Sequence, residues 1–165
     1  MTINFRFATK DDLPKIVTIY NQAIKLKNVT ADLAPISVSD RKKWFDASSH
    51  EKYPIWIIAD DDQVIGWCSL GAFYGRAAYQ HTAEISIYID ETTRGKHVGT
   101  QTIQFLATQL KQRDLQNIVA YVFRQNTPSM TLFKKQGFEQ WGLLPKVAEI
   151  DSRHLDLAIL GKHFD

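Results

Sequence analysis

The chain has 165 residues, 44% of them hydrophobic and 23% charged, with 20 basic against 18 acidic side chains and a formal net charge of +2. This length suits one domain with its own core, so we expect a single domain over residues 1–165. The near balance of charge gives no basic surface for nucleic acid and none for an anionic membrane, so neither partner is expected.

The cysteine and histidine content argues against disulfides and metal sites. Cys68 is the only cysteine, so no intrachain disulfide is possible, and its apolar neighbours favour a buried core thiol over a nucleophile. No signal peptide opens the chain and no apolar run reaches membrane length, which together with the single thiol favours the cytoplasm. The isolated histidines lack metal-ligand spacing, and we expect no metal: His50, His81, His154 and His163.

The first part of the chain predicts a strand and two helices. Apolar residues alternate over 3–7, which indicates a strand. Asp11 or Asp12 then begins a helix that accepts Pro14 in its first turn. Its apolar face has helical spacing and comprises Leu13, Ile16, Val17, Tyr20 and Ile24. Residues 27–38 lack a period and indicate a loop, and Ser39 or Asp40 starts a short second helix that carries Trp44 and Phe45.

A hairpin and an aromatic loop are predicted next. Residues 55–59 and 64–72 are apolar strands separated by the turn 60–63. The loop 73–80 (FYGRAAYQ) is rich in aromatic residues and contains one arginine.

A strand, a basic glycine-bearing segment and a helix follow one another from residue 82. The alternation of Ile85, Ile87 and Ile89 with other residues predicts a strand over 82–89, and 90–93 is a polar turn. Residues 94–100 (RGKHVGT) then open a helix. A helix N-terminus directs unpaired backbone N–H groups and the positive end of its dipole to one place, which suits phosphate.

The glycine spacing excludes two familiar phosphate loops. A P-loop has four residues between its glycines and then Lys-Ser/Thr, whereas three separate Gly95 from Gly99 and no Lys follows. A dinucleotide fingerprint has three glycines after the first strand of its fold, whereas this loop comes past the middle of the chain. Gly95 and Gly99 let the backbone approach an anion, and Arg94 and Lys96 add positive charge.

The remaining elements complete an α/β pattern. Residues 117–123 indicate a strand, 127–136 a helix capped by Gly137, and 138–150 and 154–160 two further β-rich runs. The order β-α-α-β-β-β-α-β-α-β-β predicts an antiparallel first half, some parallel pairing in the second half, and helices on both faces of a mixed sheet.

Several motifs resemble the GNAT acyltransferases. Residues 94–99 resemble the family's pyrophosphate loop, Arg/Gln-x-x-Gly-x-Gly/Ala, with His97 at its first glycine, where a Cβ limits φ and narrows the loop. Asn126 and Ser129, followed by Gly137-Phe138, resemble its second cofactor motif. Further matches resemble the branch of phosphinothricin and methionine-sulfoximine N-acetyltransferases: Tyr20-Asn21, Trp44-Phe45, Tyr53-Pro54, Gly66-Trp67, Arg76, Tyr79, Thr82-Ala83-Glu84 and Ser86-Ile87-Tyr88.

The resemblance implies a GNAT fold, acetyl-CoA as cosubstrate, and a homodimer. It implies that the pantetheine arm lies along the strand 82–89, with Glu84 as general base at the thioester end. The residues expected to bind the cofactor are Ile87, Tyr88, Ile89, Arg94, Gly95, Lys96, His97, Val98, Gly99, Thr100, Asn126, Ser129 and Phe133. Five residues separate Glu84 from Ile89, about 17 Å at strand rise, which is the reach of an extended arm.

Three features of this cofactor site leave alternatives open. Glu84 is otherwise a solvated strand residue or an ion-pair partner of Arg76, and Asn126 otherwise only starts a helix. Many family members place a Tyr where this chain has Phe133, to protonate the leaving thiolate. Here the thiolate leaves without a protein acid, or Tyr88 or Tyr121 serves.

For the acceptor we expect Thr30, Phe73, Arg76 and Tyr79, because a guanidinium can grip an α-carboxylate through two parallel bonds. Trp44 and Phe45 are candidate pocket walls, although such aromatics are more often core. The resulting hypothesis is N-acetylation of an amino acid or analogue. The rivals are a protein acetyltransferase, which needs an open groove, and a CoA-binding module without chemistry.

Overall fold

The computed structural model describes residues 1–165 and contains seven strands and four helices in the predicted order. The strands are β1 (Ile3–Phe7), β2 (Ile55–Asp60), β3 (Gln63–Ala72), β4 (Thr82–Ile89), β5 (Asn117–Phe123), β6 (Glu139–Ile150) and β7 (Arg153–His163). The helices are α1 (Leu13–Ile24), α2 (Val38–Asp46), α3 (Val98–Thr108) and α4 (Thr127–Lys135). None of the helices combines the length and the apolar character that crossing a membrane requires.

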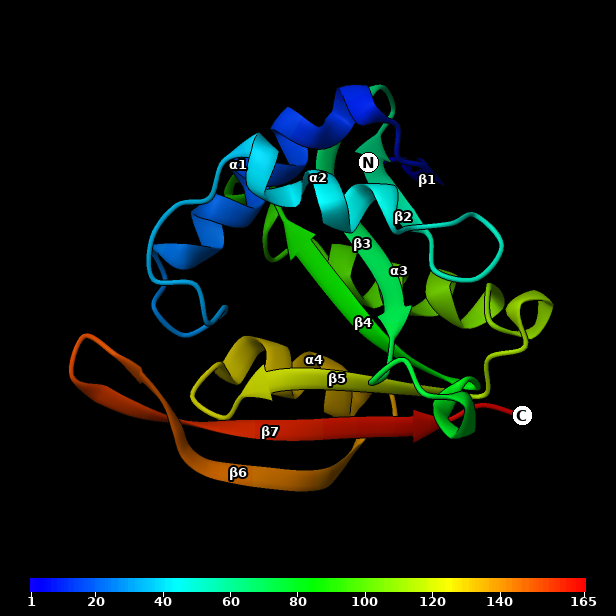
Figure 1. The fold of residues 1–165 in the computed structure, drawn as a ribbon. Helices are drawn as coiled ribbons and strands as arrows, with labels where there is room; N and C mark the ends of the chain where they lie inside the picture. The colour runs from blue at the N-terminus through cyan, green and yellow to red at the C-terminus, as the bar shows by residue number, and fades with distance from the viewer.

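All seven strands form one mixed sheet in the order β1-β2-β3-β4-β5-β7-β6 (Figure 1). The pairs from β1 to β4 are antiparallel, β4 pairs with β5 in parallel, and β5, β7 and β6 are again antiparallel. The predictions of an antiparallel first half and parallel pairing in the second half are therefore confirmed.

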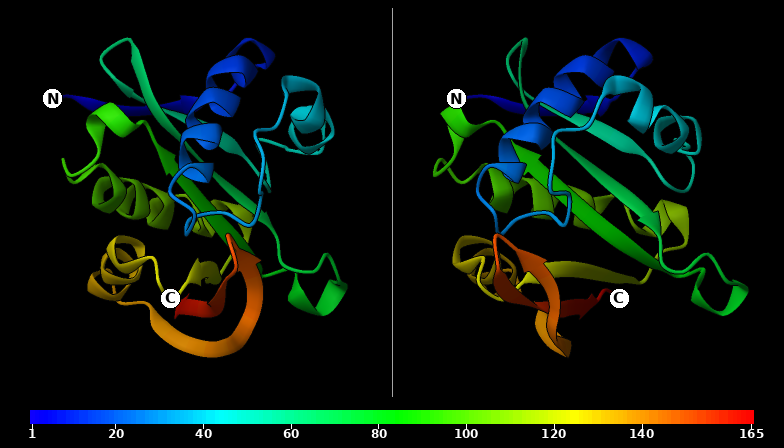
Figure 2. Two further views of the ribbon diagram at one scale, coloured as in Figure 1. Left: turned by 90° about the vertical axis from the view of Figure 1, so that its left-hand side faces the viewer. Right: turned by 60° about the vertical axis from the view of Figure 1, so that its left-hand side comes forward.

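Alternating strand residues divide the core between the two faces of the sheet. Trp56 and Ile58 of β2 pack with residues of α3 and α4, whereas Ile55 and Ile57 pack with α1 and α2. This is the period of two that strand geometry imposes. The two further views show α1 and α2 on one side of the sheet and α3 and α4 on the other (Figure 2). The predicted apolar face of α1 is buried throughout.

The helix starts differ from the predictions in detail. The second helix begins at Val38 rather than at Ser39 or Asp40, because Ser37 and Asp40 form a capping box. Asp12 holds the N-cap position of α1, as predicted, but its carboxylate does not cap the helix. It accepts hydrogen bonds from the Arg6 guanidinium at 2.8 Å and from the Thr9 backbone N–H at 2.7 Å instead. An ion pair has replaced the expected cap.

Cys68 lies in the middle of β3 and is fully buried, as predicted for a core thiol. Burial raises the pKa of the thiol, which keeps it protonated.

The close approach of β3 to β4 yields a stability prediction. A Cβ at Gly66 would lie 2.7 Å from the carbonyl oxygen of Tyr88, whereas a Cβ at Gly71 in the same strand meets its nearest neighbour at 4.0 Å. Gly66→Ala should therefore lower the free energy of unfolding by about 1–3 kcal/mol, because backbone atoms must move. Gly71→Ala is the matched control and should change it little. Urea unfolding of both variants checks this, and equal losses would contradict the packing argument.

Candidate functional site

The strands β4 and β5 are paired over only part of their length. Residues 82–84 of β4 are in register with residues 117–119 of β5, and the pairing stops after Glu84 opposite Val119. The two strands then diverge (Figure 1). Residues 85–89 therefore present toward β5 a strand edge whose backbone groups have no strand partner on that side.

This divergence opens a cleft of about 690 Å³ that runs along β4 to the start of α3. The cleft brings together Glu84 and all but one of the residues predicted to bind the cofactor: Ile87, Tyr88, Ile89, Arg94, Gly95, His97, Val98, Gly99, Thr100, Asn126, Ser129 and Phe133. Lys96 is the exception and does not line it.

The turn that precedes α3 contains two residues in the left-handed conformation. Gly95 has φ of +80°, and His97, at the N-cap of α3, has φ of +61° and ψ of +19°. His97 thus adopts the conformation that glycine would supply, at a cost of about 1–2 kcal/mol for a residue with a Cβ. The helix still begins at the next residue, with its N-terminal N–H groups toward the cleft.

Gly99 has a packing role that the sequence did not reveal. A Cβ at this position would lie 2.7 Å from Cδ2 of Leu132 in α4. The start of α3 therefore packs closely on α4, and a larger residue at position 99 would displace the end of the Leu132 side chain. Gly99, Thr100 and Leu132 all line the cleft. The contact between Gly99 and Leu132 therefore holds the wall of the cleft in place beside the start of α3.

Asp90 anchors the turn that leads into the loop. Its carboxylate accepts hydrogen bonds from the backbone N–H and hydroxyl of Thr92 at 3.0 and 2.7 Å, from Lys15 at 3.3 Å and from Gln22 at 3.4 Å. Although burial opposes ionisation, the bonds from Thr92, Gln22 and Lys15 lower the pKa of Asp90 to about 2. Lys15 and Gln22 lie on α1, so Asp90 ties the cofactor loop to that helix.

Glu84 lies at the opposite end of the cleft and is half-buried. Burial raises the pKa of its carboxyl. No salt bridge joins Glu84 to Arg76, so the alternative of an ion pair with this arginine is wrong. Glu84 lies where the gap between β4 and β5 narrows. A carboxyl group with a raised pKa at this position suits proton transfer near neutrality.

Asn126 caps α4, which is one of the two roles considered for it. Its side-chain oxygen accepts a hydrogen bond from the Ser129 backbone N–H at 3.3 Å, which caps α4. The side-chain NH₂ group makes no hydrogen bond within the chain, although the residue is largely buried and lines the cleft. The cap therefore fixes the side chain and leaves its two donors for a ligand.

The predicted acceptor residues do not line this cleft. Thr30 is buried behind it, hydrogen-bonded to the Tyr20 hydroxyl and next to Tyr88. Phe73 and Tyr79 form an aromatic cluster with Tyr74 in the loop 73–80, where Arg76 is exposed. Trp44 packs on Trp67 in the core instead of forming a pocket wall.

The loop 25–37 contributes residues that sequence reasoning missed. Three residues of this loop line the cleft: Leu26, Asn28 and Val29. The only feature of the sequence that pointed to them is that they lie close to Thr30 along the chain. Asn28 donates a side-chain hydrogen bond to the Gln125 carbonyl at 3.3 Å, and Arg153 donates to the Lys27 carbonyl at 3.2 Å. These contacts tie the loop to the start of α4 and the β6–β7 turn, so it closes one side of the cleft.

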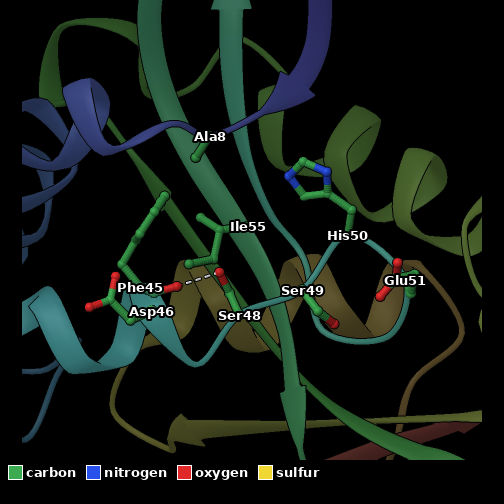
Figure 3. A pocket seen from close by; sticks show the side chains of 8 residues that line it. All are labelled: Ala8, Phe45, Asp46, Ser48, Ser49, His50, Glu51 and Ile55. Carbon is green, nitrogen blue, oxygen red and sulfur yellow. Dashed lines mark hydrogen bonds between the residues drawn. The ribbon is translucent and has the colours of Figure 1, made fainter.

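A second, shallower cavity of about 410 Å³ lies beside β2 and the segment after α2 (Figure 3). It contains Phe45 but none of the residues predicted to bind cofactor or acceptor. The Ser48 hydroxyl donates to the Phe45 carbonyl at 2.6 Å, and the His50 ring stacks on Phe7 at 3.9 Å. Because these side chains are already engaged, the cleft between β4 and β5 is the better candidate.

Comparisons with known proteins agree with this geometry. A family model described as an acetyltransferase (GNAT) domain matches residues 5–159. The Bacillus subtilis protein YwnH, provisionally named a phosphinothricin acetyltransferase, is 42% identical over 97% of this chain and 98% of its own. An L-methionine sulfoximine/L-methionine sulfone acetyltransferase of Pseudomonas paraeruginosa is 32% identical over 100% of this chain and 96% of its own.

Among solved structures, a GNAT superfamily phosphinothricin acetyltransferase from Sinorhizobium meliloti, in complex with acetyl-CoA, has a TM-score of 0.92. It is 27% identical, and the match covers 99% of this chain and 89% of that one.

The anchoring of Asp90 predicts a pH-dependent loss in Asp90→Asn. At neutral pH the variant should unfold more easily by about 1–3 kcal/mol, because hydrogen bonds to a charged group are lost. The folded pKa of about 2 lies below the ordinary 3.8, so this stability is present above pH 3.8 and is lost as pH falls toward 2. The difference from wild type should shrink over that interval in urea unfolding.

The control for this experiment is Glu91→Gln, which removes a neighbouring exposed carboxylate whose side chain forms no hydrogen bond. It should unfold like the wild type at every pH. A constant deficit of Asp90→Asn down to pH 2 would contradict the assigned anchor.

Proposed function

Because this chain belongs to the GNAT family of acetyltransferases, and is therefore an acetyl-CoA-dependent N-acetyltransferase, we propose that it acetylates the primary amine of an amino acid or analogue. Phosphinothricin and methionine sulfoximine or sulfone are the acceptor types, as the names of its relatives suggest. The observation that carries the proposal is the partial pairing of β4 with β5, which places a basic helix N-terminus and a buried carboxyl at opposite ends of one cleft.

The chemical groups at both ends of the cleft are suited to binding acetyl-CoA. The N-terminal N–H groups of α3, with Arg94 and Lys96 nearby, suit the pyrophosphate. The unpaired edge of residues 85–89 offers backbone groups to the amides of the pantetheine arm, and the Asn126 side chain adds two donors. Acetyl-CoA supplies an activated acetyl group as a thioester; the residues of the chain hold it and exclude water.

We assign Glu84 as the general base that accepts the amine proton, directly or through a water molecule. Its position at the end of strand pairing and its raised pKa support this role. No other acidic residue lines the cleft.

We assign the acceptor contacts to Thr30, Phe73, Arg76 and Tyr79. Arg76 forms no salt bridge, so its guanidinium is available to a carboxylate. Its loop reaches the cleft through Tyr74, which lies next to Tyr121. A homodimer and a cytoplasmic location remain predictions, and light scattering on the purified protein tests the first.

The test of the function is thiol release from acetyl-CoA by the purified protein against a panel of amines. The panel contains phosphinothricin, methionine sulfoximine, methionine sulfone, the common amino acids, a polyamine, an aminoglycoside and a short peptide. We expect turnover confined to the amino-acid-like acceptors. Turnover only on the peptide would indicate a protein acetyltransferase, and binding of acetyl-CoA without any turnover would favour a module that lacks chemistry.

The same assay tests Arg76. Arg76→Ala should raise KM for acceptors with an α-carboxylate about tenfold or more while KM for acetyl-CoA changes little, because a charged bidentate contact is lost. Arg124→Ala, which removes another exposed arginine, serves as the control and should leave both constants unchanged. Equal effects of Arg76→Ala on both substrates would remove it from the acceptor site.

Glu84→Gln tests the general base. The substitution keeps the size of the side chain, so acetyl-CoA affinity should be nearly unchanged by calorimetry, while kcat on the best amine should fall about 100-fold or more. Raising the pH, which supplies more neutral amine, should recover part of the lost rate. An unchanged kcat would show that another group accepts the proton.

A further inference from the structure

The sequence leaves open which hydroxyl, if any, assists the leaving thiolate. Phe133 occupies the place of the family's tyrosine, and its ring packs edge-on against Phe138 at 5.0 Å. It carries no donor, so a hydroxyl on another element must serve if the protein assists departure. Two tyrosines line the cleft, Tyr88 on β4 and Tyr121 on β5.

Tyr88 is engaged elsewhere. Its ring stacks on Trp67 at 4.8 Å and lies 5.0 Å from the ring of Tyr20, and its side chain lies near Thr30. It is also four residues along β4 from Glu84, which corresponds to about 13 Å at strand rise. Tyr88 therefore belongs to the aromatic core beside α1 and to the phosphate half of the cleft.

Tyr121 lies at the thioester end, on the same face of the sheet as Glu84. Its neighbours Ala120 and Val122 point into the core beneath α3 and α4, so Tyr121 points to the opposite face. Tyr121 lies two residues beyond Val119, which is the strand partner of Glu84. Long side chains in such diagonal positions on adjacent strands can reach each other. Burial, Tyr74 and the charge of Glu84 raise the pKa of Tyr121 to about 12, so its hydroxyl keeps the proton.

Tyr74 reaches Tyr121 from the aromatic loop. Its side chain lies near that of Tyr121 and contributes to the raised pKa of Tyr121, and its ring packs on Phe73 at 4.6 Å.

We propose that Tyr121 is a further catalytic residue, whose hydroxyl donates a hydrogen bond to the thioester sulfur as the acetyl group leaves it. This assignment rests on the proposed function and adds a residue to it.

The proposed reaction balances with these groups. The amine nitrogen forms a bond to the acetyl carbon and loses one proton to Glu84, while the C–S bond breaks and its electron pair stays on sulfur. Tyr121 stabilises that charge without giving up its proton, since a thiolate is a weaker base than a tyrosinate of this kind. Solvent protonates the thiolate after release, and Glu84 returns its proton to solvent.

The decisive experiment titrates the thiol of CoA bound to the protein, without any acceptor. The thiolate absorbance is the difference between protein with saturating CoA and protein alone. The thiol of CoA bound to wild type should ionise at a lower pH than the thiol of CoA bound to Tyr121→Phe. In the variant the bound thiol should be about tenfold weaker as an acid, because the hydrogen bond to the thiolate sulfur is lost.

Steady-state kinetics provide the second measurement. Tyr121→Phe should lower kcat about 10- to 100-fold with little change in KM for acetyl-CoA. Tyr53→Phe, which removes the hydroxyl of a tyrosine that does not line the cleft, should leave the thiol titration and kcat as in wild type. Melting temperatures of all variants separate these effects from misfolding.

The outcomes distinguish the two levels of the proposal. An unchanged thiol titration and kcat in Tyr121→Phe, with wild-type turnover intact, would overturn the role of Tyr121 and leave the function standing. A shift in Tyr88→Phe instead of Tyr121→Phe would assign the donor to Tyr88. Failure of wild type to bind CoA would refute the proposed function and this assignment with it.

Discussion

The end of strand pairing between β4 and β5 at Glu84 is the constraint on which the rest of the site depends. A continuous parallel pair would satisfy the backbone groups of residues 85–89 internally and leave no cleft. Because the pairing stops there, the cleft has a strand edge for its floor, a helix N-terminus at one end and a half-buried carboxyl at the other. An amide-containing ligand can supply the hydrogen-bond partners that the backbone groups of this strand edge lack.

The two ends of the cleft are held by different kinds of contact. At the phosphate end, Asp90 is ionised and hydrogen-bonded to α1, and the start of α3 packs on Leu132 through Gly99. These contacts keep the helix N-terminus in place, so little rearrangement is needed to bind an anion. At the other end, burial favours the neutral forms of Glu84 and Tyr121. In the proposed function, one cleft thus combines a site for negative charge with a site for proton transfer.

Much of the fold and the cofactor site was predictable, because local patterns determine them. The strand 82–89, the glycine-bearing turn and the helix behind it follow one another in the chain, and the alternation of residues determined which ones reach the cleft. The loop that closes one side of the cleft was not predictable in the same way. Leu26, Asn28 and Val29 line the cleft, although no local pattern indicated them. Their positions depend on hydrogen bonds from that loop to Gln125 and Arg153, far away in sequence.

The sequence by itself determined the elements, their order, the glycine-bearing turn before α3 and the position of the carboxyl near the start of β4. Periodicity and backbone preference are properties of neighbouring residues, so a single chain segment reveals them. Only the tertiary structure decided where β4 leaves β5, that Asp12 pairs with Arg6 instead of capping α1, and that Tyr121 lines the same cleft as Glu84. These are contacts between distant segments, and they depend on packing and burial that no local pattern records.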